Sequence, residues 1–320
     1  MFEPIVDPVA RDRSTKFPLD GLTFDMSSMP QKTLIAHGKA APVLHSLGGV
    51  QIVRLSRSLI LKSGTSVLAS EGETMRYVMA ACPEVRLPKV YRYFNVDSPS
   101  SYFGVEGYIV MDYVEGRSLD SCWDQLSQEA QKDVVTQVAA MVNQLQSIYS
   151  DSPGVIHGGI SRGMWFSDYG AGPFPTKAVF EKWINWKLAL SKHLKQAAAE
   201  VPDISYGRFV LTHGDLSPRN LILDADNQLW LIDWGCAGFY PPIFEAATLK
   251  HQVQFRSFTQ LLLPLIYNNI AEMTQLESCS YGINRVVFSL PPEMPEAGVT
   301  DYYRRKTVET VENQEIYSKK

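Results

Sequence analysis

The sequence is poor in several features that mark particular classes of protein. Its 320 residues include four cysteines, Cys82, Cys122, Cys236 and Cys279, with no Cys-x-x-Cys pair, and its six histidines are dispersed. This pattern argues against a disulfide framework and against a zinc site made by the protein alone, and it favours reduced cysteines. No apolar run approaches the roughly 20 residues that a membrane span needs. The start of the chain is too charged for a secretory signal. We therefore expect a cytoplasmic protein without membrane contact.

The charge of the chain also indicates no particular class of partner. The formal net charge is −4, and no block of like charge suggests a tail or a surface patch. There is thus no electrostatic case for nucleic acid as a partner. Hydrophobic residues make up 45% and charged residues 20%, the balance of a globular protein. A chain of this length can form two lobes of ordinary domain size.

The pattern from residue 50 to residue 114 predicts a small lobe of strands with one helix. Short runs rich in β-forming residues are separated by turn-forming residues, and one longer run ends at a Cys-Pro pair. The predicted strands are 50–55, 59–62, 88–94 and 108–114, and the predicted helix is 69–81. The first 40 residues contain four prolines and predict an irregular or short-helical extension, so residues 1–47 are set apart.

Helices dominate the rest of the chain, residues 115–320. The run 128–148 has an apolar face at the helical period, with Ser127 as a candidate N-cap. Two more helices are predicted at about 177–199 and 243–269, the second with a break near Pro264. A charged, helical end is predicted after the Pro-rich residues 290–295. Strands are predicted only at 209–212, 221–223 and 229–232, the last two forming a hairpin through the turn sequence 224–228.

One segment of this part gathers three groups that suit phosphoryl transfer. Asp215 lies in the loop after the strand at 209–212, Asn220 closes that loop, and Asp233 ends the second arm of the hairpin, which brings it back beside Asn220. Mg²⁺ prefers hard oxygen ligands, and a further carboxylate must take the proton of the attacking hydroxyl. The order His-x-Asp-x-x-x-x-Asn, hydrophobic strand, Asp-aromatic-Gly matches the catalytic and metal-binding loops of kinases.

These residues carry a resemblance to a known family. The run from His213 to Asn220 resembles the catalytic loop of the aminoglycoside phosphotransferase-like (choline-kinase-like) family, and residues 232–234 resemble its metal-binding segment. Similarity to fungal members extends over about residues 48–250. The resemblance implies an α+β, two-lobed protein-kinase-like fold. A small N-terminal antiparallel sheet lobe with one helix, 48–114, would precede a larger, mainly helical C-terminal lobe, 115–320.

The same resemblance implies the chemistry. The enzyme would use ATP and Mg²⁺ and transfer the γ-phosphate to a hydroxyl. Asp215 would be the catalytic base, and Asn220 and Asp233 would be metal ligands. Lys62, which ends a predicted strand, would bind the nucleotide phosphates.

The resemblance also assigns residues of the small lobe to the nucleotide. Glu71, in the helix after Lys62, would hold that lysine, and Glu73, two residues on, is the competing partner. The strand at 108–114 leads to a hinge. There Asp112 and Val114 would hold adenine through backbone groups, with Met111 at the pocket wall.

One expected part is missing. No Gly-x-Gly-x-x-Gly precedes Lys62, and the only glycine pair in a suitable place is Gly48-Gly49. Such a pair fits a turn as well as a cover for phosphates. The segment before residue 48 is another candidate for that cover.

Two other functional classes remain open. A Ser/Thr protein kinase would carry a lysine two residues after the catalytic Asp, where this chain has Ser217, and a long activation segment, for which the run to Glu245 is too short. A non-catalytic nucleotide-binding regulatory protein is favoured only by the missing glycine-rich loop.

We expect the acceptor to be a small hydroxylated metabolite, such as a secondary metabolite. A group of aromatic residues in the larger lobe could line its site, although core packing fits most of them better: Trp165, Phe166, Tyr169, Phe174, Trp183 and Trp186.

Overall fold

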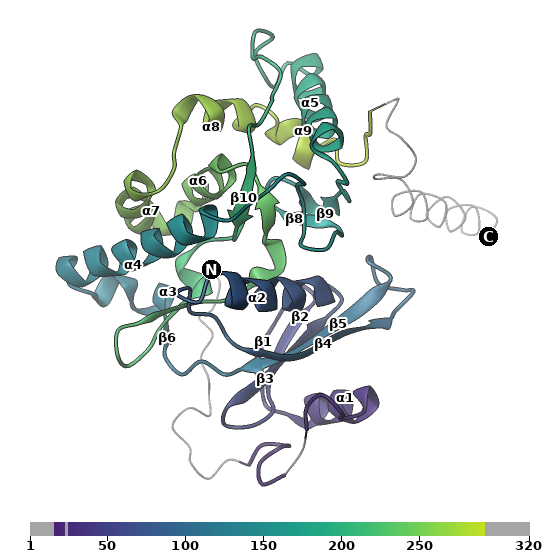
Figure 1. Ribbon diagram of the computed structural model, residues 1–320, viewed down its shortest axis with the longest axis vertical. Coiled ribbons are helices and arrows are strands. Elements are labelled where there is room, and N and C mark those ends of the chain that lie inside the picture. Colours follow the sequence, from purple (N-terminus) through teal and green to yellow (C-terminus); the bar gives the residue numbers. More distant parts are fainter. Residues whose placement is uncertain (1–15, 23–24, 292–320) are drawn as a thin grey trace, which may run out of the picture. The chain divides into compact units, whose positions relative to one another are not determined.

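The computed structural model (Figure 1) describes residues 16–22 and 25–291, which pack as two compact units. The first unit comprises the described residues up to 145, with 215–235 and 252–266. The second comprises 146–214, 236–251 and the described residues from 267 on. No helix in the described part of the chain is long and apolar enough to cross a membrane. The helical end predicted after residue 295 lies outside the described residues. The lobe boundaries at residues 48 and 115 stay a prediction.

A five-stranded antiparallel sheet dominates the first unit, with strand order β1-β2-β3-β5-β4. All four predicted strands of this region are confirmed, with shifted ends. The prediction for 108–114 ran too far, because β5 ends at Asp112. The five strands are β1 (Val43–Leu47), β2 (Val50–Arg54), β3 (Leu59–Gly64), β4 (Val90–Asp97) and β5 (Val105–Asp112).

The strand β1 was not predicted, and the glycine pair explains its presence. Leu47 pairs with Val50, so Gly48 and Gly49 form a two-residue hairpin turn, with φ angles of 61° and 77°. Positive φ at both central residues is what a type I′ turn needs. The Gly49 carbonyl accepts a hydrogen bond from the Ser66 N–H at 3.0 Å, which ties the turn to the chain beyond β3. The glycine pair is therefore the turn of the β1–β2 hairpin.

Two helices cover opposite faces of this sheet (Figure 1). Helix α1 (Gln31–Ala40) contributes Leu34 to a core that includes Val53, Leu61 and Val110. Helix α2 (Ala69–Ala81), predicted with the same bounds, lies against the other face. A Cβ on its Gly72 would be only 2.8 Å from the Tyr93 side chain. The close approach of α2 to the sheet positions its first turn.

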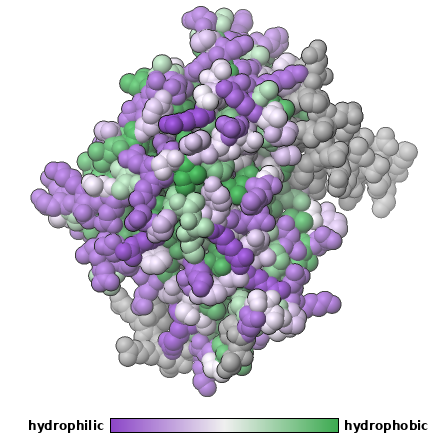
Figure 2. All heavy atoms as spheres, viewed as in Figure 1, coloured by the Kyte–Doolittle hydropathy of each residue, from purple (hydrophilic) through white to green (hydrophobic). Residues whose placement is uncertain are grey.

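The remaining elements of the first unit support a second, three-stranded sheet of order β12-β11-β6. The predicted hairpin is confirmed, and so is the N-cap of α4, because the Ser127 hydroxyl accepts from the Ala130 N–H at 3.2 Å. The end of α4 at the left of Figure 1 carries hydrophilic residues in Figure 2, as an amphipathic helix should. These elements are β6 (Arg117–Ser118), α3 (Leu119–Cys122), α4 (Gln128–Gln146), β11 (Leu221–Leu223), β12 (Leu229–Leu231) and α7 (Arg256–Leu262).

The second unit combines helices with two small sheets, of order β13-β10-β7 and β8-β9. Helix α5 stops at His193, six residues before its predicted end, and Lys195 then adopts a positive φ of 58°. Its buried Lys187 donates to the carbonyls of Val286, Val287 and Ser289 at 2.8–3.0 Å. The elements are β7 (Tyr149–Ser150), β8 (Ser161–Gly163), β9 (Ser167–Ala171), α5 (Lys177–His193), β10 (Phe209–Thr212), β13 (Gly238–Tyr240), α6 (Ile243–Lys250), α8 (Ile270–Glu277) and α9 (Ser280–Asn284).

The prediction of a helix over about 243–269 with a break near Pro264 was right about that break but missed an earlier one at Gln252. Helix α6 ends at Lys250, and Gln252 leaves the helical conformation, with φ −75° and ψ 72°. A 3₁₀ turn and α7 follow, and a second 3₁₀ turn contains Pro264. The apolar periodicity continues across the break at Gln252, so the pattern alone concealed it.

Substituting Gly107 tests the packing that positions α2. A Cβ at this β5 residue would lie 2.3 Å from the carbonyl oxygen of Val67, two residues before the start of α2. Backbone at that position cannot rotate away, so we expect Gly107→Ala to lower the free energy of unfolding by about 1–3 kcal/mol. Thermal and urea unfolding would measure the loss. Gly207→Ala is the matched control, since its Cβ would meet nothing within 4 Å. Equal stability of the two variants would contradict this packing.

Candidate active site

A buried cation lies at the centre of the site in the first unit. Lys62 on β3 is 5% exposed, and its Nζ lies 2.7 Å from Glu71 Oε1 and 2.6 Å from Asp233 Oδ1. Burial by itself would lower the pKa of Lys62, but the two carboxylates outweigh it and hold that pKa above its ordinary value. Lys62 therefore stays charged and joins the sheet, α2 and the end of the β11–β12 hairpin.

The helix turn explains which glutamate reaches this lysine. Glu71 lies in the first turn of α2 and is 3% exposed, whereas Glu73 is only half-buried. Residues two apart on a helix point about 200° apart, so Glu71 and Glu73 cannot both face Lys62. Of the two glutamates weighed from the sequence, Glu71 is the one in contact with Lys62.

The β11–β12 hairpin brings Asn220 and Asp233 together, as its turn sequence predicted. Leu221 pairs with Leu231, and the Ile232 N–H donates to the Asn220 carbonyl at 3.0 Å. Asp233 itself has a positive φ of 64°, and its side chain is 47% exposed. A non-glycine residue in this conformation carries backbone strain, which is commonly found at functional sites.

Asp215 is held by Asn220. The Asn220 amide nitrogen donates to the Asp215 backbone carbonyl at 2.8 Å and to its Oδ2 at 2.9 Å. Burial, reinforced by the negative charge of Asp233, raises the pKa of Asp215 to about 6, against the opposing effects of Arg219 and of hydrogen bonds from Asn220 and Gln252. The carboxylate is therefore ionised at neutral pH and more basic than an ordinary Asp.

Two of these neighbours were missed from the sequence. Arg219 Nη2 lies 3.8 Å from Asp215 Oδ1, and Gln252 makes a side-chain hydrogen bond to the same carboxylate. Arg219 could have been found, because residues four apart in a compact loop often pair. Gln252 could not, since it reaches Asp215 only because the chain breaks between α6 and α7.

In the second unit, a buried carboxylate holds the residues that lead into Asp215. Glu245 on α6 is 1% exposed and accepts from the His213 N–H at 2.7 Å and from the Gly214 N–H at 3.3 Å. Gly214 has a φ of 79°, and a Cβ there would lie 2.6 Å from the Cys236 carbonyl oxygen. Only glycine fits this position directly before Asp215.

The three hinge residues predicted from the sequence differ in orientation. Met111 on β5 pairs with Ile60, next to Lys62 along β3, and is 7% exposed. The Asp112 carboxylate instead accepts from the Lys89 N–H and from the Tyr91 hydroxyl, at 3.1 and 2.9 Å. Asp112 thus offers only backbone groups to a ligand on the Lys62 face. Val114 follows, half-buried, beyond the end of β5.

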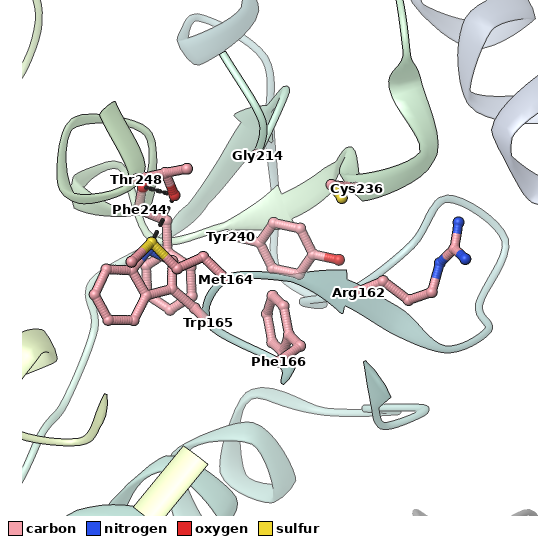
Figure 3. Close-up of a pocket in the computed structure, with 9 residues that line it drawn as sticks. All are labelled: Arg162, Met164, Trp165, Phe166, Gly214, Cys236, Tyr240, Phe244 and Thr248. Carbon is pink, nitrogen blue, oxygen red and sulfur yellow. Dashed lines mark hydrogen bonds between the residues drawn. The ribbon is translucent and has the colours of Figure 1, made fainter. Parts of the chain in front are cut away.

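The aromatic residues weighed as an acceptor site mostly form the core of the second unit. Trp165, Phe166, Phe174 and Trp183 are buried, and Tyr169 is exposed. Only Trp165 and Phe166 of this group line a small cavity, and the hydroxyl of Thr248, which also lines it, accepts from the Trp165 ring N–H at 3.0 Å (Figure 3). Figure 3 shows the Arg162 side chain extending away from the aromatic rings. The lining also includes Gly214, one peptide from Asp215.

The chain is similar to known proteins in sequence pattern and in fold. A model of the phosphotransferase enzyme family matches residues 50–267. The streptomycin–ATP ternary complex of APH(2″)-IIa is 14% identical with a TM-score of 0.50, covering 83% of this chain and 93% of that chain. The GDP and kanamycin complex of APH(2″)-IIia is 14% identical with a TM-score of 0.51, covering 76% and 82%. At this identity the likeness establishes the fold alone, and the predicted α+β protein-kinase-like fold is confirmed. A search of curated proteins gave no match.

The raised pKa of Asp215 predicts how stability depends on pH. Its ordinary value is 3.8 and its folded value about 6, so the folded chain holds the proton more tightly. The stabilisation from this group is therefore present below pH 4 and is lost as the pH rises through about 6. Asn cannot ionise, so Asp215→Asn should melt at a higher temperature than wild type at pH 7.5, and the gain should shrink toward pH 4.

Thermal unfolding at a series of pH values would measure this. Asp168→Asn, at an exposed position of the second unit, is the control. A gain for Asp215→Asn that is the same at pH 4 and pH 7.5 would contradict the raised pKa.

Proposed function

The chain belongs to the phosphotransferase enzyme family, and we propose that this small-molecule kinase moves the γ-phosphate of ATP, bound with Mg²⁺, to a hydroxyl of a small acceptor. One observation carries the proposal. The first unit holds a charged, buried lysine bridged to Glu71 and Asp233, and a basic carboxylate, Asp215, which Asn220 orients and on which the charge of Asp233 acts. Phosphoryl transfer requires a lysine on the phosphates, metal ligands and a group that orients the attacking hydroxyl.

Lys62 and Glu71 would serve the nucleotide phosphates. The contact at 2.7 Å keeps the ammonium directed away from the sheet, where a phosphate oxygen could replace its second partner, Asp233. Met111 pairs with Ile60, and Lys62 pairs with Ile109, so Met111 lies on the same face of the sheet as Lys62 and would form an apolar wall for the base. Backbone groups of Asp112 and Val114 would hold the base edge.

The donor set at Asn220 and Asp233 fits Mg²⁺. The Asn220 amide nitrogen is committed to Asp215, so its side-chain carbonyl oxygen is the group that can coordinate a cation. Asp233 adds a carboxylate that is about half exposed. Mg²⁺ takes one or two such oxygens together with phosphate oxygens, and when bound it would neutralise charge on the transferred group.

Asp215 would act as the catalytic base. A carboxylate with a pKa of about 6 is ionised at neutral pH, yet it accepts a proton more readily than an ordinary Asp. The bonds from Asn220 fix its orientation toward a hydroxyl, and Arg219 lies at 3.8 Å to balance its charge. The proton from the acceptor hydroxyl would pass to Asp215 Oδ1 or Oδ2 as the acceptor oxygen bonds to the γ-phosphorus and the bond from that phosphorus to the β,γ-bridging oxygen breaks, leaving ADP.

The alternatives are less well supported. Ser217, which is buried, stands where a Ser/Thr protein kinase carries a lysine. Helix α6 already begins at Ile243, so the chain after Asp233 leaves no room for the long activation segment that a protein kinase uses. A non-catalytic regulator would not need a basic Asp215. The two structural neighbours are named as complexes with an aminoglycoside and with ATP or GDP. For this chain we propose ATP and a small hydroxylated acceptor, with secondary metabolites included.

A screen of a cell-extract metabolite pool tests this function. Wild type with Mg²⁺ and γ-labelled ATP should produce at least one phosphorylated small molecule, detected by mass spectrometry. Asp215→Asn should slow its formation by about 10²- to 10⁴-fold, because a general base contributes that much. Asp168→Asn should match wild type. Transfer to peptides but not to small hydroxyl compounds would contradict the proposed acceptor class.

A further inference from the structure

We propose that His45 on β1 is a nucleotide-binding residue of this site, whose imidazole N–H donates a hydrogen bond to the phosphate chain of the nucleotide. The inference rests on the proposed nucleotide site. It gives a chemical role to a strand that the sequence did not predict, and it assigns to one side chain part of the work of the missing glycine-rich loop.

The register of the sheet places His45 in line with Lys62. His45 pairs with Ile52, and Ile52 pairs with Lys62. Residues directly opposite each other on neighbouring strands project from the same face of a sheet. The backbones of β1 and β3 lie about 10 Å apart, because neighbouring strands are about 4.8 Å apart. The two side chains therefore stand on one face, two strands apart.

That face is the one turned toward the proposed nucleotide. The opposite face is covered by α1 and carries the core residues Val53, Leu61 and Val110. His45 is not part of that core, and it is half-buried. Ile52 lies between His45 and Lys62 in the same row, so this apolar side chain has the imidazole on one side and the ammonium group on the other. A histidine that only filled space would not need this position.

The charges that shift the pKa of His45 also place it near the proposed nucleotide site. Burial lowers the pKa of His45; the carboxylate of Asp233 raises it, and the ammonium of Lys62 lowers it again, leaving it below the ordinary value. Both charges that act on the ring belong to the proposed phosphate and metal site. At neutral pH the imidazole is therefore uncharged, and a neutral imidazole still carries one N–H donor.

The hairpin turn explains why such a donor is needed. In protein kinases a loop with three glycines covers the phosphates and offers backbone N–H groups. Here the turn consists of Gly48 and Gly49 alone, and it is tied down. A Cβ on Gly64 would lie 2.1 Å from the Gly49 carbonyl oxygen, and the Ser66 N–H binds that same oxygen. A short, anchored turn cannot wrap the phosphates, whereas His45, three residues before it, lies on the face of the sheet that carries Lys62.

Calorimetry with ATP, ADP and adenosine, each with Mg²⁺, tests the proposal on His45→Phe, which keeps an aromatic ring of similar size and removes the N–H. We expect ATP to bind about 10- to 100-fold more weakly than to wild type, as for a hydrogen bond lost to a charged group. Adenosine should bind equally to both. His45→Gln, which retains an N–H donor, should recover part of the affinity for ATP.

Ser46→Ala is the matched control, because Ser46 is exposed on the other face of the same strand. It should bind ATP like wild type, and thermal unfolding should show all variants folded. In proton–nitrogen spectra the imidazole signal that is absent from His45→Phe should shift when ATP, but not adenosine, is added to wild type.

Calorimetry distinguishes a failure of the proposed function from a failure of the His45 assignment. If wild type binds no nucleotide, the proposed function fails, and this inference fails with it. If wild type binds ATP and His45→Phe binds it equally well, the inference alone is overturned. An equal loss of ATP and adenosine affinity would also overturn it, since His45 would then shape the base pocket rather than contact phosphate.

Discussion

The ammonium group of Lys62 lies between two carboxylates that come from distant parts of the chain. Glu71 reaches it from α2 and Asp233 from the end of the β11–β12 hairpin, at 2.7 and 2.6 Å. A buried cation left without a partner costs several kcal/mol, about 3–5 when one member of a pair is removed. The ion pairs therefore require the sheet, α2 and the hairpin to adopt one arrangement. Two close approaches, of Gly72 to the Tyr93 side chain and of Gly107 to the Val67 backbone, bring α2 close enough to meet this requirement.

The same cluster explains the properties of Asp215. Concentrating carboxylates near one buried lysine leaves Asp215 under the influence of Asp233, which adds to the effect of burial in raising its pKa to about 6. The raised pKa of Asp215 has opposite effects on the stability of the fold and on its proposed chemistry. Ionised Asp215 weakens the fold at neutral pH, but the same shift makes it an effective base. Asn220 connects both roles, because it orients Asp215 with its amide nitrogen and can offer its oxygen to a metal.

The sequence was most informative where chemistry and local pattern coincide. The run from Asp215 to Asp233 predicted a loop and a hairpin, and the hairpin does bring Asn220 and Asp233 together. The helix α2 was predicted to its ends, and Lys62 was associated with Glu71 through the family resemblance. Strand β1 was missed because it is short and because His45 and Ser46 interrupt its apolar residues, so that only the pairing across Gly48 and Gly49 defines it. Gln252 and His45 were missed because their neighbours are distant in sequence: no local pattern records a broken helix or a row across three strands.

The central claim is that the bridge from Glu71 through Lys62 organises the binding of nucleotide. Titration calorimetry of ATP with Mg²⁺ on wild type, Glu71→Gln and Glu73→Gln tests it most directly, because the two glutamates lie on the same helix and only one contacts Lys62. We predict Mg²⁺-dependent binding by wild type and by Glu73→Gln with equal affinity, and binding at least about tenfold weaker by Glu71→Gln. Equal affinity of all three proteins, or a loss confined to Glu73→Gln, would contradict the account.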